Sequence, residues 1–190
     1  MIVLASQSPR RRELLERLGI AHEVDPAHVD ETPLRGEAPL AYARRVAEAK
    51  AGAVATRHPG RAVLGADTVV VLDGAMLGKP ASPADAEAML ARLSGRQHTV
   101  ITAVSLAREG DLWTRHDETR VTFRALGRDM IRDYVATGEP LDKAGSYGLQ
   151  GRGALLVERI EGDYFGVIGL PLRLVAEVLA AAGMPYRFTR

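Results

Sequence analysis

Residues 62–72 read Ala-Val-Leu-Gly-Ala-Asp-Thr-Val-Val-Val-Leu, a run that is apolar at nearly every position and rich in valine. Such a run predicts a strand buried on both faces, as in sheets that helices cover. Asp67 is the exception, because an ionised carboxylate inside a buried strand costs several kcal/mol unless it is paired or bound to a metal. A catalytic role would explain this aspartate. The structural alternative is a strand bulge at which backbone donors satisfy it.

Helical and strand patterns alternate on both sides of this strand. An apolar run at 2–5 leads through Ser-Gln-Ser-Pro into a helical pattern that stops at Gly19. Further helices are expected at about 37–57, 82–93, 128–136 and 171–182, and further strands at 98–107, 112–123 and 154–160, with a hairpin joining the first two of these strands. The sequence therefore predicts an α/β fold with a mixed sheet, in one domain covering residues 1–190 that has room for two lobes.

The composition excludes several classes of protein. The 190 residues are 46% hydrophobic and 26% charged with a formal net charge of +1, which is typical of a globular protein and gives non-specific nucleic-acid binding no support. The chain has no cysteine, so any metal must be held by oxygen or histidine. We find neither a signal peptide nor a membrane-spanning run, and we expect a cytoplasmic protein without nucleic-acid or membrane partners.

Basic residues gather where an anion could bind. Ser8 and Pro9 fit the N-cap and first position of the first helix. This places Arg10, Arg11 and Arg12 in the first turn, where the helix dipole disfavours cations. Arginines beside unpaired backbone N–H groups form an anion site, for which a triphosphate is an obvious ligand. A solvated basic turn is the alternative.

Two lysines are further candidates for phosphate contacts. Lys50 lies in line with the apolar stripe of its helix, so its ammonium is expected to point toward the protein; snorkelling to solvent is the alternative. Lys79 lies in Leu-Gly-Lys-Pro at 77–80, which lacks the ending of a Walker phosphate loop. From this segment alone, an exposed turn lysine is the better interpretation.

Polar loops supply the remaining candidates. Asp30 and Glu31 could complete an oxygen-ligand metal site with Asp67. Residues 142–151 read Asp-Lys-Ala-Gly-Ser-Tyr-Gly-Leu-Gln-Gly and predict a loop that a ligand can approach closely, with Gln150 pairing to a base edge. A glycine-rich connection without a ligand is the alternative. His98 is interpreted as a structural residue or as a donor to another site residue.

Taken in order, these segments closely resemble the Maf family of nucleotide pyrophosphatases. The matching segments are LASQSPRR at 4–11, Glu31, Lys50, GADTVV at 65–70, LGKP at 77–80, SGRQHTV at 94–100, DKAGSYGLQG at 142–151 and GLP at 169–171. The resemblance implies a fold like that of inosine triphosphate pyrophosphatases, with a long mixed sheet flanked by helices and two lobes around a central cleft. It also implies a homodimer.

The same resemblance implies roles for individual residues. Asp67 is expected to activate water, as a general base or a metal-bound carboxylate, and Glu31 to help it hold Mg²⁺ or Mn²⁺. Lys50 and Lys79 are expected to join Asp67 as catalytic residues. The residues expected to bind the substrate are Ser6, Ser8, Arg10 and Arg11 at the phosphates and Thr68 and Gln150 at the base.

The loop at 142–151 also bears on the substrate. Its form resembles the family branch that acts on dTTP and UTP, whereas the branch that prefers 7-methyl-GTP usually has a glutamate-bearing loop. A glutamine presents both a donor and an acceptor to the imide edge of thymine or uracil. The expected reaction is hydrolysis of dTTP and UTP, or of modified pyrimidine nucleotides, to a nucleoside monophosphate and pyrophosphate. The alternative function is a nucleotide-sensing or cell-division regulatory protein with incidental hydrolysis. Gly166 stands where many relatives have asparagine, which removes a polar contact.

Overall fold

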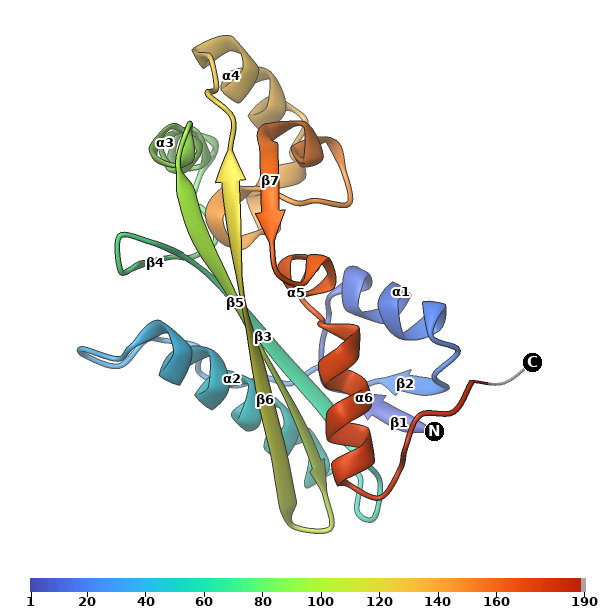
Figure 1. Cartoon of the computed structure of the whole chain (residues 1–190). Helices are drawn as coiled ribbons and strands as arrows, with labels where there is room; N and C mark the ends of the chain where they lie inside the picture. The colour runs from blue at the N-terminus through green and yellow to red at the C-terminus, as the bar shows by residue number, and fades with distance from the viewer. Residues whose placement is uncertain (189–190) are drawn as a thin grey trace. The chain divides into compact units, whose positions relative to one another are not determined.

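The computed structural model describes residues 1–188, which form strands and helices along the whole length of the chain (Figure 1). The strands are β1 (Ile2–Leu4), β2 (His22–Val24), β3 (Val63–Leu72), β4 (Ala75–Leu77), β5 (Gln97–Arg108), β6 (Asp111–Phe123) and β7 (Val157–Glu161). The helices are α1 (Pro9–Arg17), α2 (Pro39–Ala55), α3 (Pro83–Leu93), α4 (Arg128–Ala136), α5 (Tyr164–Ile168) and α6 (Leu172–Ala181). Short 3₁₀ turns cover Glu139–Asp142, Ala144–Ser146 and Arg152–Leu156.

The strands form one mixed sheet in the order β2-β1-β3-β5-β6-β7, with β4 paired to β3. β1 runs parallel to β2 and β3, whereas β4 is antiparallel to β3 and β7 is antiparallel to β6. Parallel pairs require crossover connections, and α1 and α2 provide them. The predicted α/β class with a long mixed sheet flanked by helices is confirmed.

β3 is buried along almost its whole length, as its continuous apolar run predicts. Thr68 and Val71 are its half-buried positions, and Asp67 is 6% exposed. The carboxylate therefore does lie inside a buried strand. The cost of burying this charge, which the sequence predicted, therefore has to be offset by its surroundings in the fold.

The local signals that begin helices are confirmed. Ser8 caps α1 by accepting a hydrogen bond from the Arg11 N–H at 3.4 Å, with Pro9 at the first helical position. Ser82 caps α3 by accepting from the Asp85 N–H at 3.2 Å. Because each cap satisfies an otherwise unpaired backbone donor, these short polar segments determine where the helices start.

Some elements differ from the sequence prediction. The strands β2 and β4 and the helix α5 were not predicted, because three to five residues are too few for a periodic pattern to show. The strand expected at 154–160 begins only at Val157, since the chain before it forms a 3₁₀ turn.

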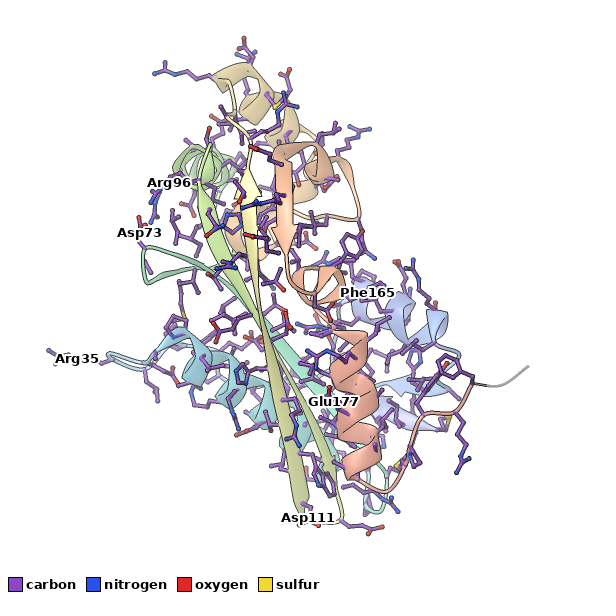
Figure 2. All side chains as sticks on the ribbon, viewed as in Figure 1. Arg35, Asp73, Arg96, Asp111, Phe165 and Glu177 are labelled. Carbon is purple, nitrogen blue, oxygen red and sulfur yellow. The ribbon has the colours of Figure 1, made fainter. Side chains whose placement is uncertain are left out.

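β4 exists because the turn before it is tight. Asp73 and Gly74 both have positive φ, at 52° and 77°, which reverses the chain as in a two-residue hairpin turn. Arg96 fixes this turn with two hydrogen bonds to the Asp73 carboxylate, at 2.6 and 2.8 Å. Figure 2 shows the two labelled side chains next to each other.

The chain divides into two compact units. Unit 1 comprises Met1–Asp67, Thr102–Asp117 and Gly169–Arg190, and unit 2 comprises Thr68–Ile101 and Glu118–Ile168. Part of the core of unit 1 packs α2 against the sheet, through Val3, Ala5, Ala51, Val54, Val63 and Ala107. The central cleft and the single-domain description stay predictions.

Candidate active site

The site in unit 1 begins with an unusually close approach of α2 to β3. A Cβ atom on Gly65 would lie 2.5 Å from the Ala47 carbonyl oxygen, so only glycine fits at this point. Residues two apart on a strand point to the same face, so Asp67 points toward α2 as Gly65 does. On the helix, Lys50 lies three residues after Ala47. Glycine in the strand therefore lets the lysine reach the aspartate.

Lys50 joins two carboxylates. Its ammonium donates to Asp67 Oδ1 at 2.8 Å and lies 3.0 Å from Glu31 Oε1. The lysine is 8% exposed, so it points into the protein as its helical position predicted, and the snorkelling alternative is wrong. The hydrogen bond from Lys50 goes to Oδ1 of the Asp67 carboxylate, so this oxygen is already engaged by a cation.

The surroundings of Asp67 favour its protonated form more than those of an ordinary aspartate. Burial raises the pKa of Asp67, and this outweighs the positive charges of Lys50 and Arg11, which lower it. Glu31 adds a small further increase. A carboxylate with a raised pKa accepts a proton more readily than a solvated one, which is the property that a general base requires.

Arg11 lies beside these carboxylates and is held from several directions. Its Nε donates to the Gly169 carbonyl at 2.8 Å, and its Nη1 donates to Ser6 Oγ at 3.3 Å. Ser6 Oγ also accepts from the Ser8 N–H at 3.1 Å. Burial lowers the pKa of Arg11, while Asp67 and Glu31 raise it and Arg10 lowers it further. The charge of Arg11 therefore interacts with the charges of Glu31, Asp67 and Arg10.

The loop that carries Glu31 is fastened to α2. Tyr42 donates its hydroxyl hydrogen to the Glu31 carbonyl at 2.8 Å, and Arg45 Nη2 donates to the Thr32 carbonyl at 3.1 Å. Arg45 is itself fixed by two hydrogen bonds to Glu37, at 2.6 and 2.8 Å. Two successive carbonyls are therefore held by one helix, while the exposed Glu31 carboxylate extends to Lys50.

In unit 2, the glycine-rich loop meets the Leu-Gly-Lys-Pro segment. The Gly145 N–H donates to the Gly78 carbonyl at 3.1 Å, next to the exposed Lys79. Gly145 has a φ of +69°, and a Cβ there would lie 2.9 Å from Val70. The two segments singled out in the sequence are therefore neighbours in this unit. Gln150 is exposed at the far end of the loop, and Thr68 is half-buried in β3.

Three residues near these segments were not given roles from the sequence alone. Tyr42 holds the Glu31 loop, Glu139 accepts hydrogen bonds from the two residues that follow the glycine-rich loop, and Tyr147 is buried against His98. The distance from His98 Nε2 to the Tyr147 hydroxyl is 2.8 Å, which agrees with the interpretation of His98 as a structural partner. A tyrosine four residues into a helix or a glutamate before a proline carries no local signal, because its partner lies elsewhere in the sequence.

The carboxylates could hold a metal ion. Within residues 1–188, no group of three or more histidine, cysteine, aspartate or glutamate side chains is arranged to do so. Glu31 and Asp67 nevertheless converge on a single cation, the Lys50 ammonium. Carboxylate oxygens suit Mg²⁺ and Mn²⁺, and Mg²⁺ is commonly held by one or two carboxylates together with water and substrate phosphates. The donor chemistry of the pair therefore fits such an ion.

The helices of the described part of the chain, residues 1–188, include none that is long and apolar enough to cross a membrane.

Comparison with known proteins identifies a family, named relatives and a partly similar solved structure. The family model described as Maf-like protein matches residues 1–182. The dTTP/UTP pyrophosphatase of Moorella thermoacetica is 57% identical over 185 residues, covering 96% of this chain and 95% of its own. That of Symbiobacterium thermophilum is 51% identical over 184 residues, covering 97% of this chain and 95% of its own. Among solved structures, the Ham1 protein of Staphylococcus aureus shares 17% identity and a TM-score of 0.47, over 64% of this chain and 71% of that chain.

Proposed function

Because the chain belongs to the Maf family, we propose that it is a nucleoside triphosphate pyrophosphatase that hydrolyses dTTP and UTP. Water would attack the α phosphorus, and the bond from that phosphorus to the bridging oxygen of the β phosphate would break. The products are a nucleoside monophosphate and pyrophosphate. Relatives at 57% and 51% identity carry the name dTTP/UTP pyrophosphatase, which supports this choice of reaction and substrate.

The observation that carries the proposal is the buried Lys50–Asp67 pair with Glu31 and Arg11 beside it. A buried pair of this kind adds little to stability, because the cost of removing both charges from water offsets their attraction. Its presence is better explained by chemistry. A poised carboxylate and fixed cations are what hydrolysis of a polyanionic substrate needs.

The residues of unit 1 can carry the proton and the charge. Asp67 accepts the proton of the attacking water through Oδ2, since Oδ1 already accepts from Lys50. Lys50, Arg10 and Arg11 stabilise negative charge on the phosphates. Ser6 contributes a hydroxyl group that accepts from the Ser8 N–H. Ser8 caps α1 and so keeps the turn that carries the arginines in place. Arg11 arrives preorganised, because Gly169 and Ser6 hold its guanidinium.

A divalent cation, Mg²⁺ or Mn²⁺, would be held by Glu31 and Asp67. When bound, it would lower the pKa of water and shield phosphate charge. Both carboxylates already face the Lys50 ammonium. A divalent ion could therefore take the place of this ammonium between them without any further acidic residue.

The residues of unit 2 supply substrate contacts in the proposal. Lys79 contacts the phosphates, while Thr68 and Gln150 select the base. Gln150 is exposed on a loop, so its amide is available to the imide edge of thymine or uracil. Modified pyrimidine nucleotides with the same edge are proposed as additional substrates.

We also propose a cytoplasmic homodimer without nucleic-acid or membrane partners. The formal net charge of +1 gives no electrostatic reason to bind nucleic acid. Sedimentation at several protein concentrations tests the dimer directly, and a monomer at every concentration would exclude it.

The test of the function is pyrophosphate release from the common and 7-methylated triphosphates, with Mg²⁺ or Mn²⁺ and with a chelator. We expect release from dTTP and UTP, a fall of at least about 10³-fold in Asp67→Asn, and little change in the control Asp73→Asn, whose carboxylate pairs with Arg96 at a turn. Full turnover in a folded Asp67→Asn protein would refute the role of Asp67. Tight nucleotide binding without release would favour the sensing function.

A further inference from the structure

Residues 148–153, which include the end of the glycine-rich loop and the two residues after it, are wrapped around one carboxylate. Glu139 Oε1 accepts from the Gly153 N–H at 3.1 Å, and Oε2 accepts from the Arg152 N–H at 2.9 Å. The Tyr134 hydroxyl donates to Oε1 at 3.0 Å and itself accepts from the Gly148 N–H at 3.3 Å. Three backbone donors from both ends of residues 148–153 are thus tied, directly or through one tyrosine, to Glu139.

The glycines of this segment face the protein. A Cβ on Gly151 would lie 2.5 Å from Glu139 Oε2, and a Cβ on Gly153 would lie 2.5 Å from the Tyr134 hydroxyl. A Cβ on Gly148 would lie 2.7 Å from Lys143 Cε. The sequence suggested that the glycines give a ligand close access. The structure shows that they let the backbone close around Glu139 and its neighbours.

The loop is also fixed where it begins. Tyr147 is 6% exposed, and its hydroxyl is 2.8 Å from His98 Nε2. Its ring packs edge to face with Phe123, at a centroid distance of 4.7 Å. Gln150 lies between these two anchored ends, and its side chain is exposed. The anchors on either side therefore fix the backbone from which the Gln150 side chain extends.

We propose that Glu139 is a positioning residue that holds the backbone carrying Gln150 in place and thereby determines how strongly the protein prefers thymine and uracil. The proposal rests on the function proposed above. Glu139 would touch no substrate. It would act through residues 148–153, whose shape depends on its two carboxylate oxygens.

The charge of Glu139 suits this role. Burial raises its pKa, but the hydrogen bonds from Gly153, Arg152 and Tyr134 together lower it below that of an ordinary glutamate. Both oxygens face donors only. A glutamine at this position would turn one oxygen into an N–H group that faces another donor, so the change from Glu to Gln is disruptive here although the two side chains have the same shape.

The test compares Glu139→Gln and Tyr134→Phe with the control Glu161→Gln in the full-length protein. Glu161 lies at the end of β7 and makes surface ion pairs with Arg120 and Arg159. Two quantities are measured: kcat and KM for dTTP, UTP and dCTP, and hydrogen exchange of the amides of residues 148–153. Tyr134→Phe is included because it leaves the carboxylate in place, should Glu139→Gln fail to fold.

We expect the ratio of kcat/KM for dTTP over dCTP to fall on the order of tenfold in Glu139→Gln, mainly through a higher KM for dTTP. Exchange of the Arg152 and Gly153 amides should become at least about tenfold faster. Tyr134→Phe should move both quantities in the same direction by a smaller factor, and Glu161→Gln should move neither.

The contrary outcomes are distinct. Faster exchange with an unchanged base ratio would overturn the inference, because Glu139 would then be only structural. An unchanged ratio and unchanged exchange would overturn it as well. If the wild-type protein releases pyrophosphate from no triphosphate, the proposed function fails, and the inference fails with it.

Discussion

Gly65 and Ala47 approach so closely that a Cβ atom on the glycine would lie 2.5 Å from the alanine carbonyl oxygen. The same atom would lie 2.7 Å from the Ala51 nitrogen, so both neighbours are backbone atoms that cannot move without the helix. One turn of α2 therefore rests directly on β3. Lys50 belongs to that turn, and its reach to Asp67 depends on this contact.

Gly65→Ala should therefore push α2 away from β3. We expect a loss of about 1–3 kcal/mol in the free energy of unfolding and a larger fall in activity, because Lys50 moves with the helix. Gly52→Ala is the control, since Gly52 lies on α2 and an added Cβ atom there would have nothing within 4 Å. This variant should gain about 0.5–1 kcal/mol in the free energy of unfolding. Urea unfolding of both variants measures the difference. Equal stability of the two would show that the contact yields without cost.

Lys50→Met should leave the Asp67 carboxylate buried without the hydrogen bond from Lys50. Removal of one partner of a buried ion pair costs about 3–5 kcal/mol, and part of this cost is avoided if the remaining group takes up a proton. The double variant Lys50→Met/Asp67→Asn should lose less than the sum of the two single variants. Thermal or urea unfolding of all four proteins gives the coupling energy. Additive losses would mean that the two side chains do not interact in solution.

His98 should make the protein sensitive to mild acid. Burial lowers the pKa of His98 to about 4, below the value near 6.5 of an unfolded histidine. The unfolded chain therefore takes up the proton first, and the stability present above pH 6.5 is lost as the pH falls toward 4. The loss should reach about 3 kcal/mol.

Urea unfolding between pH 7 and 4 measures this loss in the wild type, in His98→Gln and in the control His28→Gln, whose histidine is exposed. The part of the loss that comes from His98 should disappear in His98→Gln and remain in His28→Gln. A pH dependence that is the same in all three proteins would assign the acid sensitivity to other groups.

Tyr42→Phe should loosen the loop that carries Glu31, since the hydrogen bond from the Tyr42 hydroxyl to the Glu31 carbonyl is lost. If Glu31 helps to hold a divalent ion, the Mn²⁺ concentration for half-maximal activity should rise about tenfold, with a smaller change in kcat at saturating metal. Tyr164→Phe, at an exposed tyrosine of unit 2, is the control. An unchanged metal requirement in Tyr42→Phe would separate the loop from metal binding.

The sequence predicted those elements that have a strong local signal. The apolar run of β3, the caps Ser8 and Ser82 and the helix at 128–136 are all determined by residues within one turn or one strand. β2 was missed because its three residues are half-exposed or exposed, and such a sequence resembles that of a short loop. Only its pairing with β1 makes it a strand.

In the candidate site, too, features with a local signal were predicted, and features that depend on tertiary contacts were not. The burial of Asp67 and the inward direction of Lys50 followed from the periods of the strand and the helix, and the structure confirms both. That these two residues pair with each other did not follow, because the pairing depends on how α2 packs against β3. The glycine-rich loop was predicted as a loop, but what its glycines contact depends on Glu139 and Tyr134, which are recognisable only once the chain is folded.

The hydrogen bond from Arg11 to the Gly169 carbonyl joins residues that are 158 positions apart. At roughly 5–20 residues per second, a ribosome adds the second residue on the order of ten seconds after the first. During this time the N-terminal strand and helix exist without the acceptor that will hold their arginine. The contact that fixes the Arg11 side chain is thus completed late in synthesis, although Arg11 itself is among the first residues to be made.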